Sequence, residues 1–377
     1  MFFSIFLLFY AWAGYFVTIK ILSLFRKKTS SSAPGYDHTV TIIIAVHNEE
    51  KNIVARINNL ALQTYDRIVE IIVALDGSTD SSLDLVHSMN YEKLAVIISQ
   101  ENVGRALMHN LAVEKAKGEI LIFTDAETEF DKGYVSETVK QFNNDRIGCV
   151  VGTLKYNLRK PSSVAQGESI YWKYELAIRR AEERIGVLAN ATGAAMAIRK
   201  ILYKKLRANE DVDTATPIDI ALAGKYVSYA ENAIAYDFPP ATIQGEFASR
   251  IRGVAQTINC IMKRVTVRDI FRSPMIYFGL FWHRICRYLT FPLLLIVLSC
   301  SIAVVTSGTG NRLTFFILIL QMIFYILAAL GGLNFLRNRE SKTVDFPFNF
   351  IASTLAMSIG FYKGVSGQSP SIYKHHE

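Results

Sequence analysis

The sequence predicts an α/β domain with a mostly parallel sheet, covered by helices on both faces and carried between transmembrane helices at both ends of the chain. The first observation is that four apolar runs, "VTIIIAV", "EIIVAL", "LAVIIS" and "GEILIFT", alternate with helical segments after residue 39. Buried parallel strands form such continuous apolar runs, and helices connect them. The second observation is that long apolar stretches lie before residue 25 and after residue 287.

The composition agrees with a membrane-anchored domain. Hydrophobic residues make up 51% of the 377 residues and charged residues 20%, which is too apolar for a wholly soluble protein and too charged for a wholly embedded one. The net charge is +8, but the cations are scattered or lie beside apolar stretches, which is typical of positive-inside anchoring and argues against a nucleic-acid partner. The four cysteines have neither paired nor metal-ligand spacing, so nothing demands an oxidising compartment.

Residues 1–24 are predicted to form an N-terminal transmembrane helix, followed by a polar linker at 25–38. A length of about 20 apolar residues is enough to span a bilayer. A cleaved signal peptide is the alternative, because "AWA" resembles a cleavage site. No cation precedes the apolar run, however, whereas Arg26, Lys27 and Lys28 follow it, so we expect a retained anchor with residues 26 onward in the cytoplasm.

Residues 241–287 are expected to form interfacial helices, residues 288–363 a transmembrane region of two or three helices, and residues 364–377 a tail. "YLTFPLLLIVLSCSIAVV" and "LTFFILILQMIFYILAALGGL" have the length of spans and are joined by the turn "TSGTGN". Cations precede the first and follow the second, so both flanks are predicted to be cytoplasmic. "FPFNFIASTLAMSIGFYKG" is weaker, with Pro347 and Asn349 near its start, and could span, re-enter or lie in the interface.

Polar residues follow three of the predicted strands in the domain at residues 39–240. "HNEE" follows the first strand, "DGSTD" the second and "TDAET" the fourth. Ligands of such sheets bind beyond the carboxyl ends of the strands, so this convergence predicts a binding site there. Each segment alone could instead begin a helix, with Asn48, Thr79 or Asp80 as its cap.

Asp125 and Glu127 form the most specific pair in the chain. Side chains two apart on an extended segment point the same way, and two adjacent carboxylates repel each other unless a cation lies between them. Oxygen ligands suit Mg²⁺ or Mn²⁺, and a nucleotide diphosphate would complete the coordination shell. The alternative is a helix N-terminus whose dipole favours acidic residues.

Five segments together resemble a membrane-anchored family-2 glycosyltransferase of the GT-A fold, in the cellulose-synthase-like superfamily. They occur in the family's order between residues 39 and 260. They are "TIIIAVHNEEKNI", "EIIVALDGSTDSS", "NVGRALMHNLAVEKAKGEILIFTDAET", "SIYWKYELAIRRAEERIGVLANATGAAMAIRK" and "DVDTATPIDIALAGKYVSYAENAIAYDF". The first two segments resemble the nucleotide-binding turns of the family, and the third resembles the segment that leads to its D-x-D motif. The fourth resembles the acceptor side, and the fifth resembles the segment that carries the catalytic base.

The resemblance implies a role for each matched residue. Glu49, Asp76 and Asp80 would contact nucleobase and ribose or hold the turn that does, and Arg105 replaces a lysine that is more usual in its loop. Glu127 departs from the second aspartate of D-x-D, which changes the reach of a metal ligand. The implied donor-binding residues are Val46, Asn48, Glu49, Asp76, Asp80, Arg105, Asp125, Arg250 and Arg252. Gly193 and Ala194 would bind the acceptor, and Asp125 and Glu127 would bind the metal ion.

The resemblance assigns the catalytic base less sharply. An ungapped count back from Gly224 implies Asp213, with Asp211 as the alternative, while Asp219 matches only if a gap is allowed. Inverting transfer needs a carboxylate that takes the acceptor proton. Asp213 could instead be only an N-cap, and Asp219 is expected on a solvated helix face.

The segment after residue 243 lacks one motif of processive synthases. It contains Gln244, Arg250 and Arg252, but no Trp completes a Q-x-x-R-W pattern. An arginine there could pair with pyrophosphate, or the helix could lie on anionic lipid, and both roles are compatible.

The resemblance therefore implies an inverting transferase that moves a sugar from a nucleotide-sugar, expected to be a UDP-sugar, to a lipid-linked or polysaccharide acceptor. The expected setting is exopolysaccharide or envelope glycan synthesis at the cytoplasmic face of the inner (plasma) membrane. One alternative is a processive synthase that needs oligomerisation or a glycan-export partner. The other is a non-catalytic scaffold that binds nucleotide-sugars.

Overall fold

The structure, a computed structural model, describes residues 1–26, 37–156, 163–237, 243–337, 339 and 341–368. Its central element is an eight-stranded sheet in the order β3-β2-β1-β4-β7-β6-β8-β5. The β1–β2, β1–β4, β2–β3 and β6–β8 pairs are parallel, and the β4–β7, β6–β7 and β5–β8 pairs are antiparallel. The predicted class, an α/β domain with a mixed, mostly parallel sheet, is confirmed.

The four apolar runs form the parallel half of this sheet. They correspond to β1 (Val40–Val46), β2 (Ile68–Asp76), β3 (Leu94–Ser99) and β4 (Ile120–Thr124). Helices α3 (Ile53–Ala61), α4 (Ser82–Ser88) and α5 (Arg105–Lys115) connect them. β1 and β4 are buried along almost their whole length, which is why they carry no polar–apolar alternation.

The second half of the sheet is mixed, because two of its four strands run opposite to those of the first half. It contains β5 (Glu129–Phe130), β6 (Ile147–Tyr156), β7 (Met196–Arg199) and β8 (Tyr226–Asp237). Between them lie α6 (Tyr134–Val139), α7 (Ser163–Ile185), α8 (Val212–Leu222) and the short turns η2 (Lys140–Asn143), η3 (Gly193–Ala195) and η4 (Lys200–Leu202). Because β7 runs antiparallel to β4, the segment before β7 reaches the edge where β4 ends.

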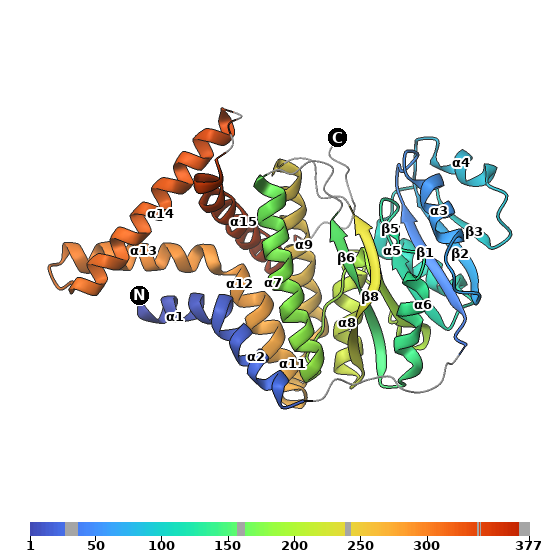
Figure 1. The fold of residues 1–377 in the computed structure, drawn as a ribbon, viewed down its shortest axis with the longest axis horizontal. Helices are drawn as coiled ribbons and strands as arrows, with labels where there is room; N and C mark the ends of the chain where they lie inside the picture. Colours follow the sequence, from blue (N-terminus) through green and yellow to red (C-terminus); the bar gives the residue numbers. More distant parts are fainter. Residues whose placement is uncertain (27–36, 157–162, 238–242, 338, 340, 369–377) are drawn as a thin grey trace.

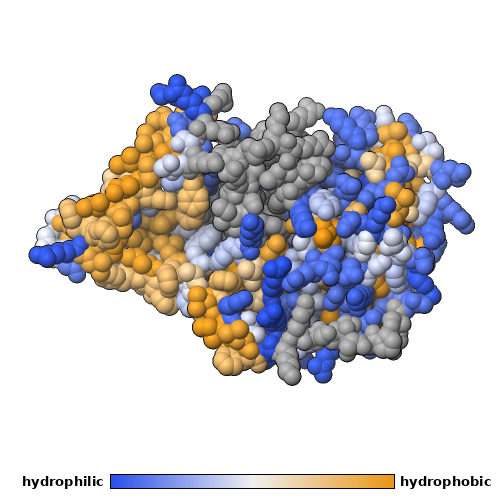
Figure 2. Space-filling model, viewed as in Figure 1, coloured by the Kyte–Doolittle hydropathy of each residue, from blue (hydrophilic) through white to orange (hydrophobic). Residues whose placement is uncertain are grey.

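Apolar helices extend from the side of the domain where α7 and α9 (Ile243–Arg264) stand (Figure 1). At the N-terminus these are α1 (Phe2–Phe9), η1 (Tyr10–Gly14) and α2 (Tyr15–Leu24). After α9 come α10 (Val267–Arg272), α11 (Pro274–Leu280), η5 (Phe281–Ile285), α12 (Cys286–Tyr288), α13 (Thr290–Thr306), α14 (Arg312–Leu336) and α15 (Lys342–Val365). Figure 2 shows hydrophobic residues gathered on this part and hydrophilic residues over the sheet domain.

Three helical segments in the described chain are long and apolar enough to cross a membrane: Phe2–Leu24, Arg312–Leu336 and Thr343–Val365. A fourth candidate consists of Pro274–Tyr288 and Thr290–Thr306, which are bent by 61°. The first predicted C-terminal span is therefore half of a broken pair rather than a straight span. The weaker last stretch forms one continuous helix, because Pro347 lies in its second turn and removes only one backbone donor.

Helix α15 also packs closely on α9. A Cβ atom at Gly360 would lie 2.6 Å from the carbonyl oxygen of Ile251, and one at Gly364 would lie 2.7 Å from Cβ of Ile258. Two glycines four residues apart lie on one face of a helix and let two backbones approach. The last apolar helix is thus joined to the helix that follows the sheet domain.

A buried polar cluster connects α7 to the segment before α13. Glu175 is 2% exposed and accepts contacts from His283 Nε2 at 2.9 Å and Arg287 Nη1 at 3.3 Å. Glu182 lies 2.7 Å from His283 Nδ1 and accepts a hydrogen bond from the Tyr15 hydroxyl at 2.6 Å. The cations expected to flank a membrane span therefore also have a packing role, since they pair with buried carboxylates of the domain.

Candidate active site

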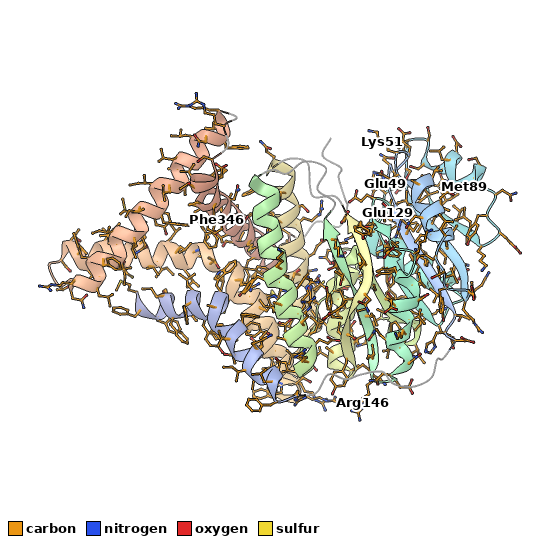
Figure 3. All side chains as sticks on the ribbon, viewed as in Figure 1. Glu49, Lys51, Met89, Glu129, Arg146 and Phe346 are labelled. Carbon is orange, nitrogen blue, oxygen red and sulfur yellow. The ribbon has the colours of Figure 1, made fainter. Side chains whose placement is uncertain are left out.

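The candidate active site lies at the edge of the sheet where β1, β2 and β4 end. Figure 3 shows Glu49, after β1, and Glu129, after β4, at the same end of the sheet, with Arg146 at the opposite end. Val46 is the buried last residue of β1 and positions the polar segment that follows it. The edge predicted from the polar strand ends is the edge that carries these residues.

The segments after β1 and β2 are joined to each other. Asn48 has a φ of 55°, a left-handed conformation that asparagine tolerates, and its side-chain oxygen accepts a hydrogen bond from the Thr79 amide at 2.8 Å. Asp80 accepts hydrogen bonds from the amides of Glu50 and Ser82, both at 3.0 Å. Although partial burial raises the pKa of Asp80, these hydrogen bonds lower it below its usual range. Asn48 and Asp80 therefore hold the two turns together.

Asp76 holds the start of α5. Its two carboxylate oxygens accept hydrogen bonds from the amides of Val103 at 2.7 Å and Gly104 at 2.9 Å, and the residue is 4% exposed. Gly104 has a φ of 94°, which a residue with a side chain rarely adopts. This turn places Arg105 as the first residue of α5, facing the end of β4.

Arg105 connects the ends of two distant elements. Its Nη1 donates to Asp125 Oδ1 at 3.2 Å and its Nη2 donates to Asp211 Oδ1 at 2.6 Å. Attraction by Asp211 outweighs partial desolvation and raises the pKa of Arg105. The guanidinium is 38% exposed, so it remains open to an anionic ligand. The structure thus brings together Asp125, after β4, and Asp211, the N-cap residue of α8.

Carboxylates crowd the position of Glu127. Partial desolvation of this exposed side chain and then repulsion by Asp237, Asp125 and Glu49 raise the pKa of Glu127 above its usual range. Such an arrangement favours a cation, and its oxygen donors fit Mg²⁺ or Mn²⁺. Among the residues that the structure describes, no three His, Cys, Asp or Glu side chains are grouped as a closed metal site. The carboxylates of Asp125 and Glu127 therefore fit a metal ion whose remaining ligands are phosphate oxygens and water.

Asp213 lies in the first turn of α8 and faces the segment before β7. Its Oδ2 accepts a hydrogen bond from the Gly193 amide at 3.1 Å. Desolvation and then repulsion by Asp211 raise the pKa of Asp213 to about 7, while Arg105 and the Gly193 amide act in the opposite direction. The N-cap interpretation of Asp213 is wrong, because Asp211 is at the N-cap position and makes no side-chain capping bond.

The Gly193–Ala194 segment is connected to β4 as well. The Thr124 hydroxyl donates to the carbonyl oxygen of Ala194 at 2.9 Å and accepts a hydrogen bond from Arg56 Nη2 at 2.6 Å. Arg56 is 2% exposed, and its guanidinium lies 4.1 Å from the centre of the Phe130 ring. The predicted acceptor-side residues and Asp125 are therefore fixed by the same strand end.

The expectation for Asp219 was wrong. Instead of a solvated helix face, the residue is 6% exposed and pairs with Arg264 of α9. Arg264 also donates through Nε to Glu210 Oε1 at 3.1 Å. A carboxylate that is occupied in this way is a structural group, and it lies on the α9 side of α8.

The predicted arginines of α9 bond within their own helix. Arg250 Nη2 donates to Glu246 at 2.6 Å and Arg252 Nη2 lies 3.5 Å from the Ser249 hydroxyl. Gln244 is exposed at the start of α9. The assignment of Arg250 and Arg252 to the donor stays a prediction.

Two residues of the site were not predicted from the sequence. Asp237 ends β8 and adds to the field at Glu127, and the carboxylate at a strand end is the signal that could have revealed it. Arg56 lies in the middle of α3, where an arginine in the sequence is expected to be exposed to solvent. No local signal distinguishes it.

The sheet domain is similar in sequence to a known protein family. Residues 41–207 match the profile of Glycosyl transferase family 2. Glycosyltransferase AglE of Haloferax volcanii is 25% identical over 130 residues, which cover 34% of this chain and 43% of that protein. UDP-Glc:alpha-D-GlcNAc-diphosphoundecaprenol beta-1,3-glucosyltransferase WfaP of Escherichia coli is 29% identical over 108 residues, covering 29% of this chain and 43% of WfaP. The chain therefore spans less than half the length of these relatives.

One solved structure is similar along nearly the whole chain. It is the mannosyltransferase PcManGT from Pyrobaculum calidifontis in complex with GDP-Man and Mn²⁺, with a TM-score of 0.72 and 18% identity, covering 97% of this chain and 98% of that one. At this identity the likeness shows the fold. The profile match shows that residues 41–207 form a glycosyl transferase family 2 domain, and the shared architecture shows that the sheet domain has the GT-A fold.

Proposed function

We propose that this protein is an inverting, metal-dependent glycosyltransferase that takes a sugar from a nucleotide-sugar at the edge formed by β1, β2 and β4. The observation that carries the proposal is the convergence of Asp125, Arg105 and Asp211, with contacts of 3.2 Å and 2.6 Å, beside the carboxylate of Asp213. A donor site needs a cation for the diphosphate, and an inverting reaction needs a base near it. In this proposal Arg105 and a bound divalent ion would supply the positive charge and Asp213 the base, within one group of side chains.

Each residue has a distinct task in this proposal. Asp125 and Glu127 would hold the divalent cation, which when bound neutralises the diphosphate as it leaves. Arg105 places a second positive charge beside the same group. Asp213 accepts the proton of the acceptor hydroxyl, and its raised pKa makes it a stronger base than an ordinary aspartate. Asp76 and Asp80 keep the turns that surround the nucleotide in place.

The donor and acceptor classes rest on chemistry and on the names of relatives. WfaP is named for a UDP-sugar donor and a diphosphoundecaprenol acceptor, and PcManGT was solved with GDP-Man. We infer a UDP-sugar donor and a lipid-linked or polysaccharide acceptor in envelope glycan synthesis. The apolar helices support placement at a membrane, where such an acceptor is presented. We place the domain on the cytoplasmic face, as the positive flanks predict.

A turnover screen tests the proposal. Purified protein in detergent is incubated with UDP-glucose, UDP-N-acetylglucosamine, GDP-mannose and undecaprenyl-diphosphate acceptors, with Mn²⁺ or with EDTA. Sugar transfer that requires the metal is expected with at least one donor. Tight nucleotide binding without turnover of any donor would instead support a non-catalytic scaffold. Polymer products in the absence of other proteins would support a processive synthase.

A further inference from the structure

The turn at residues 191–193 is fixed to the candidate base by two backbone groups. The Ala191 amide donates to the carbonyl oxygen of Asp213 at 2.8 Å, and the Gly193 amide donates to its Oδ2 at 3.1 Å. One bond sets the backbone of Asp213 and the other sets the direction of its carboxylate. The orientation of the base therefore depends on how firmly this turn is held.

Thr192 lies between the residues that carry these two amides, and its side chain is bonded to a residue of α7. Arg179 Nη1 donates to the Thr192 hydroxyl at 2.9 Å, and Arg179 is 5% exposed. A buried arginine with its planar donors pointing in fixed directions is a rigid support, because its rotamers are restricted by packing. The side chain reaches the turn through the hydroxyl of Thr192.

Arg179 is in turn held by the buried cluster before α13. Its Nε donates to Glu175 Oε1 at 3.2 Å, and the other oxygen of Glu175 lies 2.9 Å from His283 Nε2. Glu175 is also paired with Arg284 at 3.4 Å and Arg287 at 3.3 Å. One continuous set of buried polar contacts thus runs from the helices next to the apolar region to the turn at residues 191–193.

We propose that Arg179 is a positioning residue, which holds Thr192 so that the Gly193 amide directs the carboxylate of Asp213 toward the acceptor. Glu175 makes this support continuous with the segment that contains His283 and Arg287. The inference rests on the proposed function, because it takes Asp213 as the base. It adds a residue on α7 that the five family-like segments gave no role, and it connects the packing of the apolar helices to the geometry of the reaction.

The most specific test removes only the Thr192 hydroxyl, which accepts the hydrogen bond from Arg179. Thr192→Val keeps the shape of the side chain and leaves Arg179 paired with Glu175, so the buried charge is not stranded. Thr192→Ser restores an acceptor for Arg179. Arg180→Met is the matched control, since Arg180 is the next residue of α7 and its ion pair with Glu231 is about half exposed, each side chain at 49%.

Each variant is measured in two ways. The first is kcat for sugar transfer together with the dissociation constants of UDP and GDP with Mn²⁺. The second is amide hydrogen exchange of the segment that contains Gly193, which needs no turnover. For Thr192→Val we expect kcat to fall about tenfold, less than the roughly 100-fold that a 1 Å misplacement can cause. We expect unchanged nucleotide affinity and faster exchange at Gly193. Thr192→Ser should recover most of the rate, and Arg180→Met should match the wild type.

The outcomes separate this inference from the proposed function. Wild-type kcat and wild-type exchange in Thr192→Val would overturn the positioning role. So would a loss of rate that Thr192→Ser does not recover or that Arg180→Met reproduces. If the wild-type protein transfers no sugar from any donor, the proposed function fails. In that case faster exchange at Gly193 in Thr192→Val still supports the tether, and unchanged exchange refutes it.

Discussion

Replacing Arg105 with glutamine removes the charge that bridges Asp125 and Asp211. The side chain keeps hydrogen-bonding atoms but loses contacts of 3.2 Å and 2.6 Å to two carboxylates. A hydrogen bond to a charged group contributes about 1.5–3 kcal/mol. If that contribution is lost in the transition state, the rate of sugar transfer by Arg105→Gln should fall roughly 10- to 100-fold. Because the guanidinium is 38% exposed, solvent screening favours the lower end of that range.

The pH dependence gives this prediction a second readout. The base must be deprotonated to act, and its pKa is raised to about 7, so the wild-type rate should fall as the pH drops below that value. Arg105 lowers the pKa of Asp213, so its loss should move the acid limb of the rate profile to higher pH. The assay is kcat/KM against pH for wild type, Arg105→Gln and Arg105→Lys. Arg105→Lys keeps the charge and should move the acid limb less. A glutamine variant with a wild-type rate and an unmoved acid limb would refute this role of Arg105.

Three further predictions concern the metal, the fold and the membrane. Asp125→Asn should weaken Mn²⁺-dependent nucleotide binding measured by calorimetry, whereas Glu127→Asp should retain this binding because the variant keeps a carboxylate. Equal binding by the wild type and both variants would argue against this metal site. Arg264→Met removes the buried guanidinium that pairs with Glu210 and leaves Glu210 only the more exposed Arg207 as a cation. It should cost about 3 kcal/mol of stability in chemical unfolding, the lower end of the range for breaking a buried ion pair; an unchanged midpoint would contradict that pairing. A cysteine at Arg337 should resist impermeant maleimides in intact cells, and rapid labelling would reverse the proposed orientation.

The parallel half of the sheet could be predicted from the sequence because its strands are continuous apolar runs, and β1, β2 and β4 are buried along almost their whole length. β1 and β3 coincide with the apolar runs "VTIIIAV" and "LAVIIS", and β4 falls within "GEILIFT". β7 is only four residues long and antiparallel, and no short run of that length identifies a strand by itself. The segment that contains β7 stands out in the sequence only through its resemblance to the acceptor side of the family.

The side-chain partners at the site could be predicted only in part. The strand-end rule found Asp125, but the bond from Arg105 to Asp211 joins residues 106 positions apart, and no local pattern encodes it. The same limit explains the error at Asp219. Its polar character suggested a solvated position, whereas its partner Arg264 lies 45 residues further along, on a helix whose placement depends on the tertiary fold.

The most direct measurement compares Asp213→Asn with Asp219→Asn for both the rate of sugar transfer and the binding of the nucleotide. A general base typically contributes about 100- to 10,000-fold, so Asp213→Asn should lose that much in kcat while the dissociation constant of the nucleotide stays unchanged. Asp219→Asn should keep a far larger share of the rate, because that carboxylate pairs with Arg264 away from the turn at Gly193. A wild-type rate in Asp213→Asn, with the loss appearing in Asp219→Asn or Asp211→Asn, would contradict the assignment of the base and move it to that carboxylate.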